Sequence, residues 1–128
     1  MRFLHLSDLH LGKRVYGFSM LEEQMDALLQ IERIAGDQEV DAVVVAGDIY
    51  DKGVPPTEAV ELLDRFWTHL LAMGVQVLAI SGNHDSAERL SFAQDILAAS
   101  GLHIAGVQGQ AVRRVRLSDA WGPVDFFL

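Results

Sequence analysis

The chain has 128 residues, of which 50% are hydrophobic and 22% are charged, and it contains no cysteine. This length fits one domain with its own core, the composition excludes a disordered chain, and the lack of cysteine excludes disulfides, thiolate metal ligands and a cysteine nucleophile. The formal net charge of −8 disfavours nonspecific binding to phosphate backbones, unless bound divalent cations neutralise several of the carboxylates.

Short apolar runs predict three strands in the first part of the chain, at residues 2–6, 42–46 and 75–80. The run at 42–46 contains only Ala and Val, which is typical of a strand that is buried on both faces. Helical segments separate the three strands, and the connections are short. We therefore expect right-handed βαβ units and a parallel sheet.

Apolar residues at helical spacing predict two long helices between these strands, at residues 19–35 and 57–73. The first helix begins with Ser19 and Glu22 at the spacing of a capping box, in which each side chain bonds the backbone N–H of the other residue.

A third helical segment is expected at residues 87–99, either continuous or restarted at Ser91. Beyond it, three further short strands are predicted at residues 103–105, 112–117 and 124–128. No helix separates the last two strands, so we expect the sheet to become partly antiparallel there. The chain ends inside the apolar run VDFFL, from which we expect a truncated domain.

Polar side chains follow each of the three parallel strands. The three runs are Ser7-Asp8-Leu9-His10, Gly47-Asp48-Ile49-Tyr50-Asp51 and Gly82-Asn83-His84-Asp85. The carboxyl ends of parallel strands open on one crevice, where ligands bind in sheets of this kind. We therefore expect five side chains to converge, namely Asp8, His10, Asp48, Asn83 and His84.

The spacing within these runs suits a metal site. Asp8 and His10 are two residues apart, so in extended chain their side chains leave on the same side and can chelate one ion. Gly47 and Gly82 allow the backbone to come close to the site. Oxygen and imidazole ligands without sulfur favour manganese, iron or zinc over calcium. A central carboxylate such as Asp48 can bridge two ions about 3.5 to 4 Å apart, an arrangement that hydrolyses phosphate esters.

The motifs D-x-H, G-D-x-x-D and G-N-H-D, in this order at strand ends, resemble the signature of the calcineurin-like metallophosphoesterases. The longer runs HLSDLHLGKRVYGFSMLEEQ, GDIYDKGVPP and GNHDSAERLSFAQDIL resemble the DNA nucleases of that family, and the likeness covers essentially the whole chain. The resemblance implies an α/β fold, built as a four-layer α/β/β/α sandwich. It also implies exonuclease and endonuclease action on double-stranded DNA ends and hairpins in repair, recombination and replication, a coiled-coil ATPase partner and a homodimer.

The resemblance also assigns roles within the site. The implied metal ligands are Asp8 and His10 for a first ion, Asp48 as the bridge, and Asn83 for a second ion. The implied ions are two Mn²⁺, with Mg²⁺, Fe²⁺ or Zn²⁺ as alternatives. His84 is not expected to bind a metal ion. It is expected to stabilise the transition state or to protonate the leaving oxygen, with Asp85 orienting its ring.

The family completes both metal shells with later histidines, in a Gly-His pair and a Gly-His-x-His motif, and neither motif occurs in this sequence. We therefore interpret residues 1–128 as the N-terminal part of a nuclease domain, with the remaining ligand motifs and any capping domain absent. Two alternatives stay open: another phosphoesterase of the same fold acting on small phosphodiesters or phosphoproteins, and a fragment that binds without turnover.

Basic residues near the motifs have two interpretations. Lys13, Arg14 and Arg89 flank the expected crevice and either contact DNA phosphates or are ordinary exposed loop charges. A second group is predicted to form a solvated strand edge that resists aggregation, and it consists of Arg113, Arg114 and Arg116.

The remaining candidates are predicted to be structural. Asp51 is expected to brace its loop, His5 to lie in the core or behind the ligands, and His69 and His103 to be packed or half-exposed. No apolar run reaches the ~18 residues of a membrane span, and the start of the chain does not have a signal-peptide core. We expect a cytoplasmic protein without a membrane partner.

Overall fold

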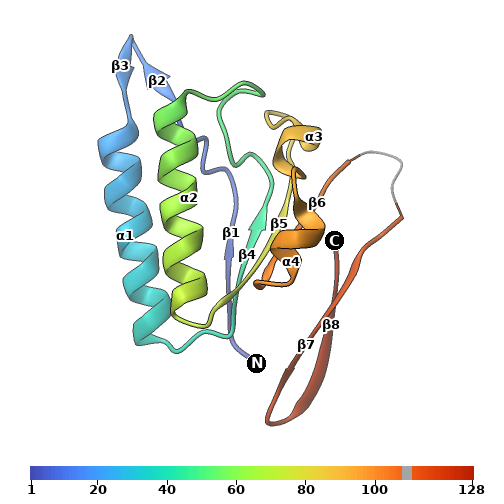
Figure 1. Ribbon diagram of the computed structural model, residues 1–128. Helices are drawn as coiled ribbons and strands as arrows, with labels where there is room; N and C mark the ends of the chain where they lie inside the picture. Colours follow the sequence, from blue (N-terminus) through green and yellow to red (C-terminus); the bar gives the residue numbers. More distant parts are fainter. Residues whose placement is uncertain (108–110) are drawn as a thin grey trace.

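The computed structural model describes residues 1–107 and 111–128 and shows a mixed α/β fold (Figure 1). In chain order its elements are β1 (Phe3–Leu6), β2 (Arg14–Val15), β3 (Phe18–Ser19), α1 (Leu21–Asp37), β4 (Ala42–Ala46), α2 (Thr57–Ala72), β5 (Gln76–Ile80), α3 (Ala87–Leu90), α4 (Gln94–Ala98), β6 (Leu102–Ala105), β7 (Arg114–Asp119) and β8 (Gly122–Phe127). Within the described residues, no helix is both long and apolar enough to cross a membrane.

At the centre of the fold, the part of the chain that the structure describes forms a parallel sheet of four strands in the order β1-β4-β5-β6. The register places Phe3 beside Ala42, and Ala42 beside Gln76. Because neighbouring strands are parallel and are paired with little stagger, the loops that follow β1, β4 and β5 leave the same edge of the sheet. The predicted βαβ units and parallel sheet are confirmed.

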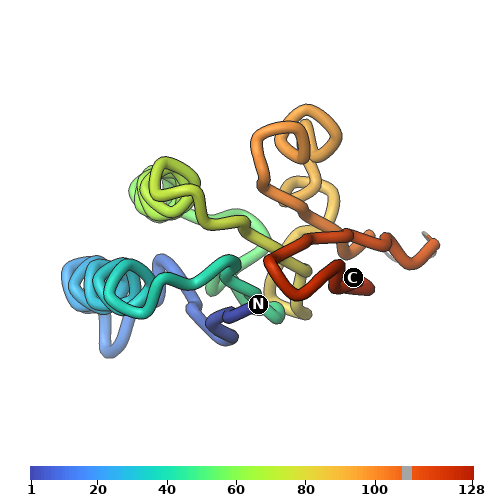
Figure 2. Tube along the Cα trace, turned by 90° about the horizontal axis from the view of Figure 1, so that it is seen from below, coloured from blue at the N-terminus to red at the C-terminus, as the bar shows by residue number. Residues whose placement is uncertain are grey.

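Side chains alternate across the central strand β4, and its two faces pack against different layers. Val43 and Val45 are fully buried in the cluster formed with α1 and α2, which lie side by side on one face (Figure 2). Ala42 is fully buried on the opposite face, against Val115 of β7. The predicted burial of this strand on both faces is therefore confirmed.

Helix α2 supplies the largest apolar side chains of the core. Leu63, Phe66 and Leu70 are almost completely buried, and they recur at the three- and four-residue spacing that forms one stripe of a helix. The short helices α3 and α4 extend this layer, since Leu90 and Leu97 pack in the same cluster.

The first helix begins later than the sequence predicted, and the proposed capping box is wrong. Ser19 belongs to strand β3, in a hairpin with β2 that the sequence analysis did not predict. The residue before α1 is Met20, without a side-chain cap, and the Ser19 hydroxyl instead accepts a long 3.4 Å hydrogen bond from the N–H of Leu21.

The third helical segment is broken, as one of the two alternatives proposed. The second piece, α4, does not start from Ser91, however. The residue before it is Ala93, in a left-handed conformation with φ 57° and without a side-chain cap.

The final strands do not extend the central sheet, contrary to the expectation that it would become partly antiparallel. Strands β7 and β8 form a separate antiparallel pair that packs on the face of the sheet opposite the long helices. Val115 contacts Ala42 and Leu78 across this interface. The described residues therefore contain a helical layer, a parallel sheet and a second small sheet, which correspond to three consecutive layers of the expected sandwich.

Candidate metal centre

The loops after β1 and β4 stay paired beyond the ends of their strands. The backbone N–H of Asp8 donates to the carbonyl of Gly47 at 3.2 Å, and that of His10 donates to the carbonyl of Asp48 at 2.9 Å. Leu11 continues this ladder with a bond to the next loop residue and is itself buried. The two motifs are therefore held in register by backbone hydrogen bonds as well as by the sheet.

Three of the predicted ligands have left-handed backbone conformations. The φ angles are 56° at Asp8, 44° at His10 and 48° at Asp48. Such angles are uncommon for residues with a side chain, and they cluster at functional sites where surrounding contacts maintain them. The expectation that Asp8 and His10 converge through an extended chain is wrong, because a tightly curved backbone brings them together instead.

The ring of His10 lies between two carboxylates. Its Nε2 is 3.8 Å from Oδ1 of Asp8 and 3.9 Å from Oδ2 of Asp48. These separations are too long for hydrogen bonds. Two ligand atoms each about 2.1 Å from one ion are roughly 3.0 to 4.2 Å apart, depending on the angle at the ion, so the distances fit ligands that share a divalent cation.

The Nδ1 atom of His10 is the ring nitrogen that does not face Asp8 and Asp48. It is buried without a hydrogen-bond partner, and the nearest carboxylate oxygen, from Asp51, is 3.5 Å away. A buried imidazole normally has its polar atoms satisfied. A carboxylate beside the second ring nitrogen is common behind a metal-binding imidazole, and it leaves Nε2 to Asp8 and Asp48. These oxygen and imidazole donors fit a bound divalent ion.

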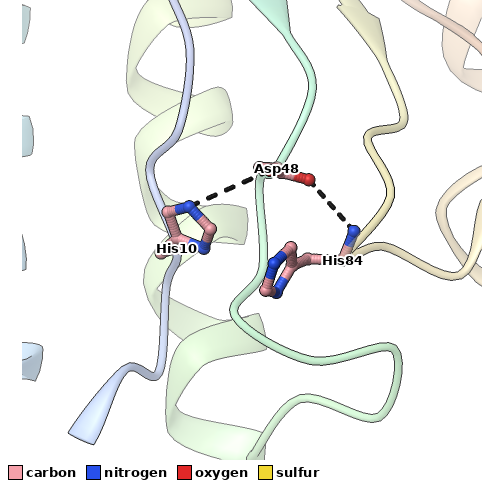
Figure 3. A group of neighbouring side chains, drawn as sticks. All are labelled: His10, Asp48 and His84. Carbon is pink, nitrogen blue, oxygen red and sulfur yellow. Dashed lines mark hydrogen bonds and ion pairs between the residues drawn. The ribbon is translucent and has the colours of Figure 1, made fainter.

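His84 enters the group from the third loop (Figure 3). Its backbone N–H donates to Oδ1 of Asp48 at 3.0 Å, and its ring meets the His10 ring edge to face, with centroids 4.9 Å apart. One ligand atom each from His10, Asp48 and His84 lie within 4.8 Å of one another. Loops after three different strands thus place these three side chains at one point. Asp8 lies beside His10, at the margin of this group.

The orientation of the His84 ring is set by a backbone carbonyl. Nδ1 of His84 donates to the carbonyl of Asp51 at 2.9 Å. This hydrogen bond is the main reason why the pKa of His84 is raised, and the nearby carboxylates, first among them Asp48, raise it further. The residue that the sequence assigned only to bracing the loop therefore also aims the ring, through its main chain, which sequence reasoning could not detect.

Asp85 does not take the role of orienting the His84 ring that the sequence predicted. One of its oxygens accepts from the N–H of Ile49 at 3.0 Å and of Gly82 at 2.8 Å, and the other accepts from Tyr50 at 2.7 Å. The carboxylate therefore joins the second and third loops and acts on His84 only through its charge.

The second and third loops also touch through their glycines. A Cβ on Gly82 would lie 2.1 Å from Oδ1 and 2.3 Å from the backbone nitrogen of Asp48. Gly47 has φ 86°, and a Cβ there would lie 3.1 Å from Cα of Gly82. The expectation that both glycines allow close backbone approach is confirmed.

The other predicted residues are exposed in the segments around the group of His10, Asp48 and His84. Asn83 is exposed in the third loop, between Gly82 and His84. Lys13 and Arg14 are exposed on the β2–β3 hairpin, and Arg89 is exposed on α3. These positions do not show whether Asn83 binds a metal ion or whether the three basic residues contact DNA, so their roles stay predictions.

The remaining histidines lie away from this centre. His5 is exposed on β1, so its expected place in the core is wrong. His69 pairs with Glu32 at 3.2 Å between α2 and α1, and His103 is half-buried, where burial lowers its pKa. Both agree with the predicted structural roles.

The basic run near the end of the chain lies on the small sheet. Arg116 makes two hydrogen bonds, of 2.7 and 2.8 Å, to Asp125 on the neighbouring strand. Arg113 lies 3.6 Å from Asp95 of α4. These pairs agree with a solvated strand edge.

Comparison with known proteins connects this geometry to one family. The sequence model described as "Calcineurin-like phosphoesterase" matches residues 1–122. The chain is 40% identical over 107 residues to SbcD, a subunit of the nuclease SbcCD, from Bacillus subtilis (strain 168), covering 83% of this chain and 27% of that protein. It is 38% identical over 111 residues to the protein of the same name in Escherichia coli (strain K12), covering 87% and 28%. For the Staphylococcus saprophyticus protein of that name, the figures are 33% over 128 residues, covering 99% and 33%. The chain spans a third or less of the length of these relatives.

Proposed function

The chain belongs to the calcineurin-like phosphoesterase family, and from this membership we propose that it forms part of a divalent-metal nuclease of the SbcD type. The observation that carries the proposal is the convergence of His10, Asp48 and His84 from loops after three separate strands. The names of the similar proteins support a nuclease over other phosphoesterases. The proposed substrates are double-stranded DNA ends and hairpins, cleaved in repair and recombination.

We propose that residues 1–128 are the N-terminal part of the nuclease domain, because the similar proteins are three to four times as long as the matched segment. The proposed partner is a coiled-coil ATPase subunit of the SbcC type, since the relatives carry the name of an SbcCD nuclease. A homodimer and a cytoplasmic location are proposed with it.

The metal ligands in this proposal are Asp8, His10, Asp48 and Asn83, and the proposed ions are two Mn²⁺. Bound divalent ions supply Lewis acidity towards the phosphoryl oxygens and lower the pKa of a water molecule. The left-handed conformations at Asp8, His10 and Asp48 support this assignment, as do the distances of 3.8 and 3.9 Å from Nε2 of His10 to the carboxylates of Asp8 and Asp48. Mg²⁺, Fe²⁺ and Zn²⁺ suit the same donor set.

His84 is proposed to act on the substrate. Its Nδ1 is occupied by the carbonyl of Asp51, which leaves Nε2 for a phosphoryl oxygen or the leaving oxygen. In its protonated form this ring can stabilise negative charge or donate a proton. Asp85 supports this role indirectly, because it fixes the loop on which the ring is carried.

The test replaces His84 by Ala in the full-length protein, with His69→Ala as the matched control on an exposed histidine of α2. We expect His84→Ala to retain Mn²⁺ uptake in calorimetric titration and to lower DNA cleavage at least about 100-fold, the usual range for a general acid or base. His69→Ala should leave both unchanged. Loss of metal uptake would identify His84 as a ligand. Hydrolysis of bis(p-nitrophenyl) phosphate without cleavage of linear DNA would replace the nuclease by a phosphoesterase of small substrates.

A further inference from the structure

The β2–β3 hairpin is an exposed projection beside the metal centre. Tyr16 and Gly17 form its turn, with φ angles of 47° and 83°, both in the left-handed region that a tight two-residue hairpin requires. Figure 1 shows the hairpin beyond the end of α1, at the edge of the sheet from which the ligand loops leave. The hairpin therefore lies beyond the N-terminal end of α1, on the side of the fold where the ligand loops lie.

The root of the hairpin is bonded directly to the His10 loop. The N–H of Lys13 donates to the carbonyl of His10 at 3.1 Å, and the N–H of Met20 donates to the carbonyl of Lys13 at 3.1 Å. From α1, the side-chain amide of Gln24 donates to the same His10 carbonyl at 2.7 Å. These bonds fix the direction of the hairpin relative to the ligand.

The hairpin has an apolar face and a basic face. Val15 pairs with Phe18, and Arg14 pairs with Ser19, so each pair lies on one side of the two strands. The exposed fraction is 98% for Tyr16 and 75% for Phe18. Two aromatic side chains are therefore left in solvent on the hairpin that begins with Lys13 and Arg14. The Arg14 guanidinium donates to the carbonyl of Gly17, which holds it at the turn beside Tyr16.

We propose that this hairpin stacks Tyr16 and Phe18 on bases at the end of the DNA, while Lys13 and Arg14 contact the adjoining phosphates. The inference rests on the proposed nuclease function and extends it to the recognition of ends. Charge supports this occupant, because the chain has a net charge of −8 and yet places two consecutive basic residues here. Every base has a face on which an aromatic ring can stack, whatever its sequence.

The preference for ends follows from the geometry of stacking. In the interior of a duplex both faces of a base are covered by its neighbours, so an aromatic ring can stack there only by first unstacking base pairs, which costs a few kcal/mol per step, whereas a base at an end or in an unpaired segment has a free face. Three residues of strand separate Lys13 from Tyr16, a rise of about 10 Å, or roughly three nucleotide steps of one DNA strand. The tip and the root of the hairpin can therefore contact the same DNA end.

The test measures binding of the full-length protein to a duplex with a short single-stranded end that carries 2-aminopurine. Ca²⁺ replaces Mn²⁺ to prevent cleavage, and a closed circular duplex without ends serves as the comparison. The variants are Tyr16→Ala and Tyr16→Phe. Trp121→Ala is the matched control, because Trp121 is also an exposed aromatic residue at a hairpin turn and is 94% exposed. Its backbone N–H donates to Asp119, the residue that binds the amino terminus.

We expect Tyr16→Ala to weaken binding of the end-bearing duplex by about 5- to 150-fold, the range for loss of one stacked base, and to abolish the 2-aminopurine quenching. Tyr16→Phe should keep both, because its ring still stacks. Trp121→Ala should bind like the unaltered protein. Binding of the circular duplex and hydrolysis of bis(p-nitrophenyl) phosphate should not change in any variant.

Equal binding by Tyr16→Ala and Trp121→Ala would overturn the inference and leave the nuclease function standing. An equal loss on ended and circular DNA would also overturn it, since the hairpin would then be a general backbone contact. If the unaltered protein hydrolyses bis(p-nitrophenyl) phosphate but binds neither DNA, the proposed nuclease function fails and the inference fails with it.

Discussion

The contact between Gly82 and Asp48 allows a sharp test of how the metal centre is built. In Gly82→Ala, the added methyl group would start 2.1 Å from Oδ1 of Asp48. The φ of Gly82 is not in the left-handed region, so the substitution introduces steric conflict without backbone strain. Since the conflict involves the backbone nitrogen of Asp48 as well, a change of its side-chain rotamer cannot relieve it.

The size of the effect follows from what must move. Asp48 or the third loop has to shift by roughly 1 Å to reach ordinary contact, and overpacking of this kind costs about 1 to 3 kcal/mol. The shift also disrupts the hydrogen bond from the His84 N–H to the carboxylate of Asp48; this bond is exposed and therefore contributes less than a buried bond to a charged acceptor would. Because the loops are partly exposed, we expect the free energy of unfolding to fall by about 2 to 4 kcal/mol.

The assays are thermal unfolding and calorimetric titration with Mn²⁺. We expect Gly82→Ala to lower Tm by about 10 °C and to weaken metal binding at least about 10-fold, because a displaced ligand no longer points at the ion. Gly36→Ala is the control. Gly36 lies in α1, where a Cβ would meet only the Met73 sulfur at 3.9 Å, so the substitution should stabilise the helix by about 0.5 to 1 kcal/mol.

Wild-type metal affinity and an unchanged Tm in Gly82→Ala would refute this account. The close approach of the two loops would then not be what positions Asp48. A lower Tm with unchanged metal affinity would separate the two effects and limit the role of Gly82 to stability.

Two further predictions concern carboxylates. Asp85→Asn turns an amide group towards backbone N–H donors of two loops, so we expect urea unfolding to show a loss of about 2 to 4 kcal/mol, whereas Glu88→Gln on the exposed side of α3 should change nothing. The pKa of Asp125 lies below its ordinary value because Arg116 donates to it, so the pair stabilises the small sheet above the unfolded pKa and loses this effect as the pH falls through the folded pKa. An NMR titration should show the Asp125 midpoint rising in Arg116→Gln; an unchanged midpoint would contradict the assignment.

From the sequence one could predict the order of the two long helices and the four strands of the central sheet, and the positions of the polar motifs. The continuous Ala and Val run of β4 and the apolar stripe of α2 are strong local signals. They predict these elements well because they indicate which faces of each element are buried. The convergence of His10, Asp48 and His84 could also be predicted. Asp48 and His84 follow parallel strands, and parallel strands end at one edge.

The β2–β3 hairpin could have been found by a weaker signal. Tyr16-Gly17 lies between short apolar segments, which is a pattern compatible with a tight hairpin turn. The strands are only two residues long, however, and the capping-box spacing at Ser19 competed for the same residues. Two local patterns overlapped, and only the structure shows which of them is formed.

The partners of each side chain were decided by the tertiary structure alone. Asp85 bonds the backbone of the second loop, and the carbonyl of Asp51 holds the ring of His84, because the sheet register brings the second and third loops within hydrogen-bond distance. The packing of Val115 on Ala42 was equally invisible in the sequence. Periodicity reports which face of an element is apolar, but contacts between distant segments depend on how the elements are stacked, and local sequence does not encode that arrangement.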